Sequence, residues 1–281
     1  MNSCEHDLLN NCQQNYKRRE YSFNSVIALM DRGNIRKKQE DSLLISKHKL
    51  YPNNEILLIA DGMGGLNNGA FASNLAATNS LVWFQSLKKL NSINSLKKEY
   101  EKFVLQLDDL IRIKCGDGGT TLVTAFLLED VVLIANIGDS RAYIYDNNEL
   151  IQVTKDQSVT QKLLDDGMIT SKEHMRFHKK NNLILSRLGC EKRLLTLDFY
   201  EIDIEKMNQL YLFSDGITDC VSDSTLNSII SSNTFDQIPS KIINIALSEN
   251  SHCPIKSQDY YEMIQAGKDN ASIIGKIKRR K

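Results

Sequence analysis

The sequence predicts an α+β domain in which two mainly antiparallel sheets pack together and are flanked by helices. Four short β-rich runs follow one another, and two-residue and three-residue connections separate two of the pairs, so these pairs must form antiparallel hairpins. Helical patterns precede and follow the runs, which favours a layered arrangement. The four runs cover residues 120–128, 131–137, 140–145 and 149–153.

The remaining elements follow from apolar spacing. Residues 1–22 are polar and charged, so we expect a loose N-terminal leader followed by one domain over residues 23–281. The nearly unbroken apolar run at 55–60 is typical of a strand that is covered on both faces. We expect further strands at 25–29, 42–46, 195–202, 209–213 and 271–277, and helices at 70–90, 96–111, 158–166, 224–231 and 238–247.

Composition excludes several classes of function. Lysine plus arginine and aspartate plus glutamate both number 35, so no net field attracts nucleic acid or a membrane surface. No apolar run approaches the 18 residues of a transmembrane helix. The six cysteines are scattered without a C-x-x-C pair, which favours free thiols in a reducing compartment. We expect a cytoplasmic monomer; delivery into a host by an unrecognised signal stays an alternative.

Three acidic residues share one local context, at the end or the start of a hydrophobic strand. Asp61 and Asp215 are each followed by glycine, and Asp269 is followed by asparagine. A buried strand fixes its end rigidly, and a glycine lets the backbone approach a ligand closely. A lone Asp-Gly is most simply a turn. Three aspartates at strand ends instead predict an oxygen-rich metal site that suits Mg²⁺ or Mn²⁺.

Two further segments supply charged groups. Arg36 precedes Glu40 and Asp41 by a few residues, and its guanidinium offers a planar fork of donors for a phosphate group. Asp139 lies in a tight turn between two strands. Taken alone, Asp139 is a turn residue or an ion-pair partner of Arg141.

Together these segments resemble the metal-dependent Ser/Thr protein phosphatases of the PPM group, also called type 2C, in their bacterial form. The resemblance covers about residues 26–277, and its motifs occur in the family's order. They are Arg36, Glu40 and Asp41; Asp61-Gly62-Met63-Gly64-Gly65; Gly119-Thr120-Thr121-Leu122; Gly138-Asp139-Ser140-Arg141-Ala142-Tyr143; Val153-Thr154-Lys155-Asp156-Gln157-Ser158; residues 183–189; Ser214-Asp215-Gly216-Ile217-Thr218-Asp219; and Lys268-Asp269-Asn270-Ala271-Ser272.

The resemblance implies a four-layer α-β-β-α sandwich with two Mn²⁺ or Mg²⁺ ions in a cleft at one end of the sheets. Asp61 would bridge both ions and activate the attacking water, with the Gly62 carbonyl as a ligand of one ion. The same resemblance gives Asp215 and Asp269 to the other ion. By the same resemblance, Glu40 and Asp41 would supply the remaining ligands of the two ions, partly through water. Asp139 and Asp215 would hold a weaker third ion. Arg36 would bind the phosphate group of the substrate.

The implied activity is hydrolysis of phosphoserine and phosphothreonine in proteins, opposing a Ser/Thr kinase. Two alternatives stay open, namely a relative that acts only on one phosphorylated regulator and a catalytically silent binding module with the same fold. Residues 165–182 match the flap that shapes substrate access in bacterial members. Residues 248–265 are longer than the family needs, and are either a partner-binding insertion or a surface loop. Gln39 and Gln157 replace the family's usual Asn and His at positions that we expect to be structural.

Overall fold

The protein is described by a computed structural model of the whole chain. The structure describes residues 8–9, 17–23, 25–64, 68–88, 92–190, 195–253 and 255–278. Most of the expected leader therefore lies outside the described residues. In the described part of the chain, no helix has both the length and the apolar character needed to cross a membrane.

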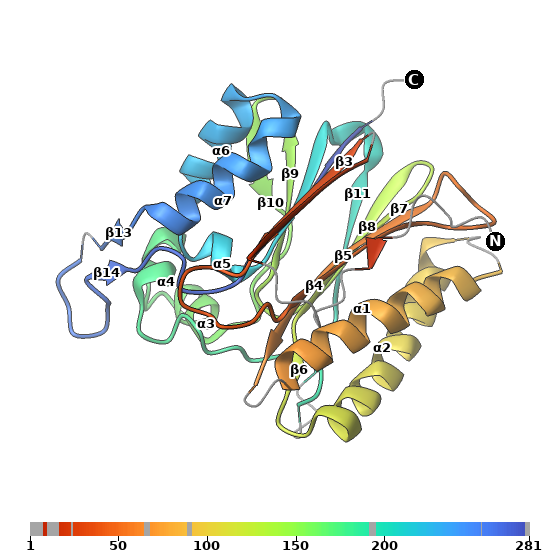
Figure 1. Cartoon of the computed structure of the whole chain (residues 1–281), viewed down its shortest axis with the longest axis horizontal. Coiled ribbons are helices and arrows are strands. Elements are labelled where there is room, and N and C mark those ends of the chain that lie inside the picture. Colours follow the sequence, from red (N-terminus) through yellow and green to blue (C-terminus); the bar gives the residue numbers. More distant parts are fainter. Residues whose placement is uncertain are drawn as a thin grey trace.

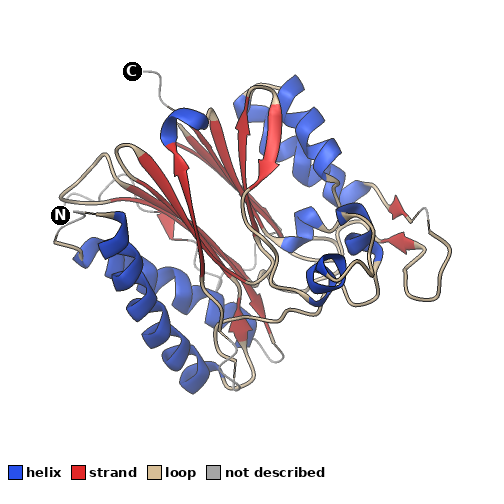
Figure 2. Cartoon of the chain, turned by 180° about the vertical axis from the view of Figure 1, so that it is seen from behind, coloured by secondary structure: helices blue, strands red, loops and turns tan. Residues whose placement is uncertain are grey.

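Two antiparallel sheets form the centre of the molecule (Figures 1 and 2). Among the described residues, the first sheet has the order β1-β4-β5-β7-β8-β11, and β6 pairs with β5 beside this path. The second sheet has the order β10-β9-β12-β15-β3-β2. The first sheet contains β1 (Leu8–Leu9), β4 (Asp41–Lys47), β5 (Glu55–Met63), β6 (Gly119–Thr120), β7 (Leu122–Leu127), β8 (Val131–Ile137) and β11 (Asp198–Asp203). The second contains β2 (Arg18–Phe23), β3 (Val26–Asp31), β9 (Arg141–Asp146), β10 (Glu149–Gln152), β12 (Gln209–Phe213) and β15 (Ala271–Ile277).

Helices cover the outer face of each sheet. The long pair α1 and α2 lies on the first sheet, and α6 and α7 lie on the second (Figure 1). The shorter helices α3, α4 and α5 gather at one end of the sandwich, next to the small β13–β14 hairpin (Figure 1). The helices are α1 (Asn68–Ser86), α2 (Ile93–Cys115), α3 (Val159–Asp165), α4 (Lys172–Phe177), α5 (Asp215–Thr218), α6 (Asp223–Ser232) and α7 (Ile238–Ser248), and the hairpin strands are β13 (Ser251–His252) and β14 (Met263–Ile264).

Each of the three interfaces between layers is a hydrophobic cluster. Residues such as Tyr100 of α2 pack onto the first sheet, and Ile242 of α7 packs onto the second. Between the sheets, side chains such as Leu43 and Leu212 interdigitate and are fully buried. The α-β-β-α layering expected from the resemblance is therefore confirmed.

The strands and helices predicted from periodicity all occur, with boundaries that shift by a few residues. Two expectations need correction. The expected loose leader over residues 1–22 includes part of an edge strand. Arg18–Phe23 forms β2, which pairs with β3, and its side chains alternate in exposure. β5 does not end with the apolar run at residue 60. It continues through Gly62 to Met63, because β6 pairs with these two residues.

A buried ion pair joins the two sheets at the end of the sandwich away from Gly62. The Nζ atom of Lys276 in β15 donates to Glu55 at the start of β5, and both side chains are nearly inaccessible. Lys276 also donates to the Oγ atom of Ser25, at 3.0 Å. Lys276 is one of several basic residues near the end of the sequence, which would be expected in solvent, but the β15 ladder carries this residue into the core.

We expect Lys276→Ala to lower the free energy of unfolding by about 3 kcal/mol, because Glu55 would be left as a buried charge without its cation. Urea denaturation followed by circular dichroism measures the change. In the double variant Lys276→Met with Glu55→Gln, both charges are gone and most of the stability should return. Equal stability of Lys276→Ala and the wild type would contradict the pairing.

Candidate metal centre

Asp61 and Asp41 face each other on neighbouring strands of the first sheet. They are direct cross-strand partners on β5 and β4, so their side chains project from the same face. The backbone N–H of Asp61 donates to the Oγ1 atom of Thr121 at 3.1 Å, and the N–H of Thr121 donates to the Asp61 carbonyl at 2.9 Å. This reciprocal pair of hydrogen bonds explains why a Gly-Thr-Thr segment accompanies the acidic residue.

Gly62 follows Asp61 where β5 passes close to the start of α1. A Cβ atom at this position would lie 2.3 Å from the carbonyl oxygen of Gly69 and 2.5 Å from that of Glu40. The backbone N–H of Gly62 also donates to the Glu40 carbonyl at 3.2 Å. Any side chain would force these backbones apart, so the glycine is required by packing. The role of its carbonyl as a metal ligand stays a prediction.

Asp215 and Asp269 come from the second sheet. Asp215 opens α5 directly after β12, and Asp269 lies just before β15, the antiparallel neighbour of β12. Ser272 of β15 ties the group together, since its N–H donates to the Oγ atom of Ser214 at 3.0 Å and its hydroxyl donates to the Asp41 carboxylate at 2.6 Å. The second of these bonds crosses between the sheets, and it fixes the two halves of the acidic cluster relative to each other.

Arg36 lies at the rim of this cluster. Its Nη2 atom donates to the Oδ2 atom of Asp269 at 2.6 Å, and its Nη1 atom lies 3.7 Å from the Oε2 atom of Glu40. The arginine side chain is about half exposed. Asn270 holds the loop in place, because its Oδ1 atom accepts the N–H of Glu40 at 2.7 Å and its Nδ2 atom donates to the Lys38 carbonyl at 3.0 Å. The sequence did not single out Asn270 for this positioning role.

The clustered carboxylates raise one another's pKa. Burial, followed by the negative charge of Asp215, raises the pKa of Asp61 well above its ordinary value. Burial raises the pKa of Asp41 to about 7, although its hydrogen bond from Ser272 opposes the shift. Burial and the charge of Asp269 raise the pKa of Asp215 to about 6. These shifts show that Asp41, Asp61, Asp215 and Asp269 lie within electrostatic reach of one another.

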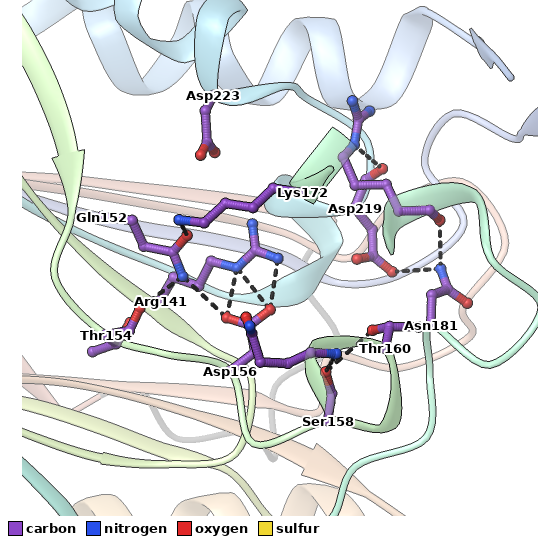
Figure 3. Close-up of polar contacts among 12 residues, drawn as sticks. Arg141, Gln152, Thr154, Asp156, Ser158, Thr160, Lys172, Asn181, Asp219 and Asp223 are labelled. Carbon is purple, nitrogen blue, oxygen red and sulfur yellow. Dashed lines mark hydrogen bonds and ion pairs between the residues drawn. The ribbon is translucent and has the colours of Figure 1, made fainter. Parts of the chain in front are cut away.

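Asp139 joins the same cluster from the β8–β9 turn. Burial, and then the charge of Asp215, raises its pKa well above the ordinary value. The turn is held by Gln157, whose Oε1 atom accepts the N–H of Gly138 at 2.8 Å. Arg141 makes its ion pair with Asp156, with donor–acceptor distances of 2.7 to 3.1 Å (Figure 3). The alternative that Asp139 serves as the ion-pair partner of Arg141 is therefore wrong.

The structure also confirms that the two glutamines that depart from the family pattern are structural. The N–H of Asp41 donates to the Oε1 atom of Gln39 at 3.1 Å. Gln157, besides supporting Gly138, donates from its Nε2 atom to the Oδ2 atom of Asp198 at 2.8 Å. Each amide therefore fixes the backbone beside an acidic residue of the cluster.

Asp219 is an acidic member of the cluster that the sequence motif contained but that we did not assign to the site. Its carboxylate accepts a hydrogen bond at 3.1 Å from the Nδ2 atom of Asn181, at the end of the flap (Figure 3). Burial and the charge of Asp215 raise its pKa to about 8. The signal was its spacing, because residues four apart lie on the same face of a helical turn and Asp215 begins such a turn.

The donor set fits hard divalent cations. It consists of oxygen atoms, and the Oδ1 atoms of Asp139 and Asp215 are buried without a hydrogen-bond partner among the described residues. Within that part of the chain, no three Asp, Glu, His or Cys side chains converge on one point so that they could hold a metal ion as they stand. At the rim of the cluster, Asp269 instead pairs with Arg36 at 2.6 Å.

Comparisons with known proteins identify the class to which this fold and acidic site belong. Residues 26–163 match the family model for protein phosphatase 2C. The serine/threonine phosphatase stp of Listeria welshimeri is 33% identical over 216 residues, which cover 72% of this chain and 81% of that protein. The chain therefore belongs to the protein phosphatase 2C family, in its bacterial form.

Solved structures agree with this assignment. The serine/threonine phosphatase Stp1 from Staphylococcus aureus superimposes with a TM-score of 0.78 at 25% identity, covering 92% of this chain and 96% of that one. The catalytic domain of the phosphatase PstP, solved in complex with two manganese ions, gives a TM-score of 0.67 at 25% identity over 93% of this chain and 99% of that one. Members of the family use Mn²⁺ or Mg²⁺.

The raised carboxyl pKa values predict that the metal-free protein loses stability as the pH rises. Asp41 and Asp215 have pKa values of about 7 and about 6 in the folded state, against an ordinary value of 3.8. Between about pH 4 and pH 7 the folded state therefore retains protons that the unfolded state has released, and the free energy of unfolding falls with increasing pH.

Urea denaturation in EDTA at pH 5 and pH 7.5 measures this slope. Asp215→Asn should flatten it, and added Mn²⁺ should raise stability at pH 7.5 more than at pH 5, since cations bind the ionised carboxylates. Identical slopes for the wild type and Asp215→Asn would contradict the assigned pKa shift.

Proposed function

We propose that this chain hydrolyses phosphoserine and phosphothreonine in proteins with two divalent cations, Mn²⁺ or Mg²⁺, held by its acidic cluster. One observation carries the proposal: carboxylates from both sheets meet at one end of the sandwich and raise one another's pKa. Concentrated negative charge of this kind is costly unless cations offset it. The family membership and the phosphatase relatives support the same reaction.

The ligand assignment is the one that the family resemblance implies, and the positions of the carboxylates support it. Asp61 lies between Asp41 of its own sheet and Asp215 of the other, which suits a residue shared by both ions. Asp215 and Asp269, which lie beside the ends of adjacent strands of the second sheet, would complete the ligand shell of one ion. Glu40, Asp41 and Gly62 would complete the shell of the other, and Asp139 with Asp215 would hold a weaker third ion.

Arg36 would bind the substrate phosphate. Its guanidinium is about half exposed at the rim and is held by Asp269 and Glu40. When bound, the cations lower the pKa of a water molecule and offset the charge on the phosphoryl oxygens. The planar fork of Arg36 would bind the equatorial oxygens of the phosphoryl group and orient its ester bond for in-line displacement.

The physiological setting is part of the same proposal. The substrates are phosphoproteins whose phosphorylation a Ser/Thr kinase supplies, and the enzyme acts as a cytoplasmic monomer without nucleic acid. The equal numbers of acidic and basic residues support the absence of a polyanion partner. Free thiols at the four cysteines in the described part of the chain support a reducing compartment.

Asp61→Ala tests the reaction. Because this carboxylate is shared by both ions, we expect kcat for Mn²⁺-dependent hydrolysis of p-nitrophenyl phosphate to fall by about 10³-fold. Mn²⁺ affinity, measured by calorimetry, should fall in parallel. The matched control Asp236→Ala removes an exposed carboxylate that is not part of the cluster and should change neither quantity. A wild-type protein that binds no Mn²⁺ and hydrolyses no phosphate ester would be a silent binding module instead.

Arg36→Ala tests phosphate binding separately. Charged hydrogen bonds are worth about 1.5–3 kcal/mol, so we expect KM for phosphopeptides to rise by about 10- to 100-fold. Mn²⁺ affinity should change little, Arg36→Lys should recover part of the loss, and the exposed neighbour Lys37→Ala serves as a control. If only the Mn²⁺ affinity changed while KM stayed constant, Arg36 would be a structural partner of Asp269.

A further inference from the structure

A cavity of about 290 Å³ opens beside the acidic cluster. Two of the proposed metal ligands form one side, and apolar residues from the β13–β14 hairpin and the end of α5 form the other. The volume is near the lower limit of small-molecule sites, so it suits one or two side chains better than a cofactor. The residues that define the two sides are Asp215, Asp269, Cys220, Tyr261, Met263 and Ile264.

The apolar side of the cavity is held by the flap. The N–H of Tyr261 donates to the Phe177 carbonyl at 2.7 Å, and the N–H of Lys179 donates to the Asp259 carbonyl at 2.9 Å. The ring of His178 meets the ring of Tyr260 edge-on at 5.3 Å. These contacts join the hairpin to the segment that follows α4, next to which it lies in Figure 1. The last residues of the 248–265 segment, Tyr261 and Met263 to Gln265, therefore form a wall of the cavity that contacts with the flap brace.

The exposure of the wall residues indicates a surface that accepts a ligand. Tyr261 and Met263 are 39% and 42% exposed, although both are large and apolar, while Ile264 and Cys220 behind them are buried. Apolar side chains that are left open beside a reaction centre contribute free energy when a ligand covers them. Two charged residues outside the proposed ligand set also line the cavity, Asp219 and the exposed Lys268.

The position of the cavity identifies the ligand. Because Asp215 and Asp269 line it, a phosphorylated residue bound at the cation site places its own chain neighbours at the cavity mouth. Successive residues of an extended peptide are separated by about 3.3–3.6 Å, so only residues close to the phosphorylated one can reach the wall. The occupant is therefore a side chain of the substrate itself.

We propose that the β13–β14 wall is a specificity subsite that binds a large aliphatic or aromatic side chain within two residues of the phosphoserine or phosphothreonine. This inference rests on the proposed phosphatase function and adds its preference among phosphoprotein sequences. Met263 and Tyr261 contact the substrate side chain, and the flap holds them in place.

Synthetic phosphothreonine peptides that differ at one position test the subsite. Each position from two before to two after the phosphothreonine carries either Phe or Ser, and kcat/KM is measured with Mn²⁺ on the full-length protein. At one of these positions we expect Phe to be preferred over Ser by about 10-fold. In Met263→Asp this ratio should fall close to one, since the acidic group opposes burial of the ring.

Three outcomes separate the possibilities. The control Ile113→Asp, at a 76% exposed apolar residue of α2, should keep the wild-type ratio. Hydrolysis of all peptides with no preference, or a preference that Met263→Asp leaves unchanged, overturns the subsite while the phosphatase function stands. Failure to hydrolyse any peptide or p-nitrophenyl phosphate with Mn²⁺ overturns the proposed function first.

Discussion

The mutual repulsion of buried carboxylates is the constraint on which the rest of the site depends. Moving one ionised group out of water costs several kcal/mol, and placing others beside it adds Coulombic cost. The fold tolerates the cluster because fixed donors hold its members. The Ser272 hydroxyl donates to the Asp41 carboxylate, the backbone N–H of Thr121 donates to the Asp61 carbonyl, and Asn181 donates to the Asp219 carboxylate. The apolar interfaces thus stabilise the fold enough to offset the repulsion between the clustered carboxylates, and this cluster attracts cations.

The packing of one sheet on the other sets the dimensions of this centre. Asp41 and Asp61 are carried by the first sheet, whereas Asp215 and Asp269 are carried by the second. A rigid, close-packed interior such as the Leu43–Leu212 layer resists changes in sheet separation. The Ser272–Asp41 hydrogen bond at one end and the Lys276–Glu55 ion pair at the other both span the interface. The carboxylates can therefore come from distant parts of the chain and still meet reproducibly.

Sequence periodicity was sufficient for the layered fold because the strands and helices here bury ordinary apolar faces. The positions of Asp61 and Asp215 could also be predicted from the sequence, because each lies at the end of a strand and the strand end limits where the next side chain can point. Other features depend on long-range contacts that no local pattern records. Lys276 has the composition of a basic tail, yet β15 draws it into the core. The wall at Met263 likewise depends on the flap contacts of Tyr261.

Recognition and chemistry share one structural element in this protein. α5 carries Asp215 at its start, and Asp219 and Cys220 follow directly at its end, so the short helix borders both the acidic cluster and the cavity. The flap is joined to the same helix, because the Nε atom of Arg176 donates to the Asp219 carbonyl at 3.0 Å and its Nη2 atom donates to Ser251 of the hairpin at 3.3 Å. A substrate side chain that presses on the wall therefore acts on the element that orients the ligands. Selectivity in such an arrangement arises from correct placement of the phosphoryl group as well as from contact area.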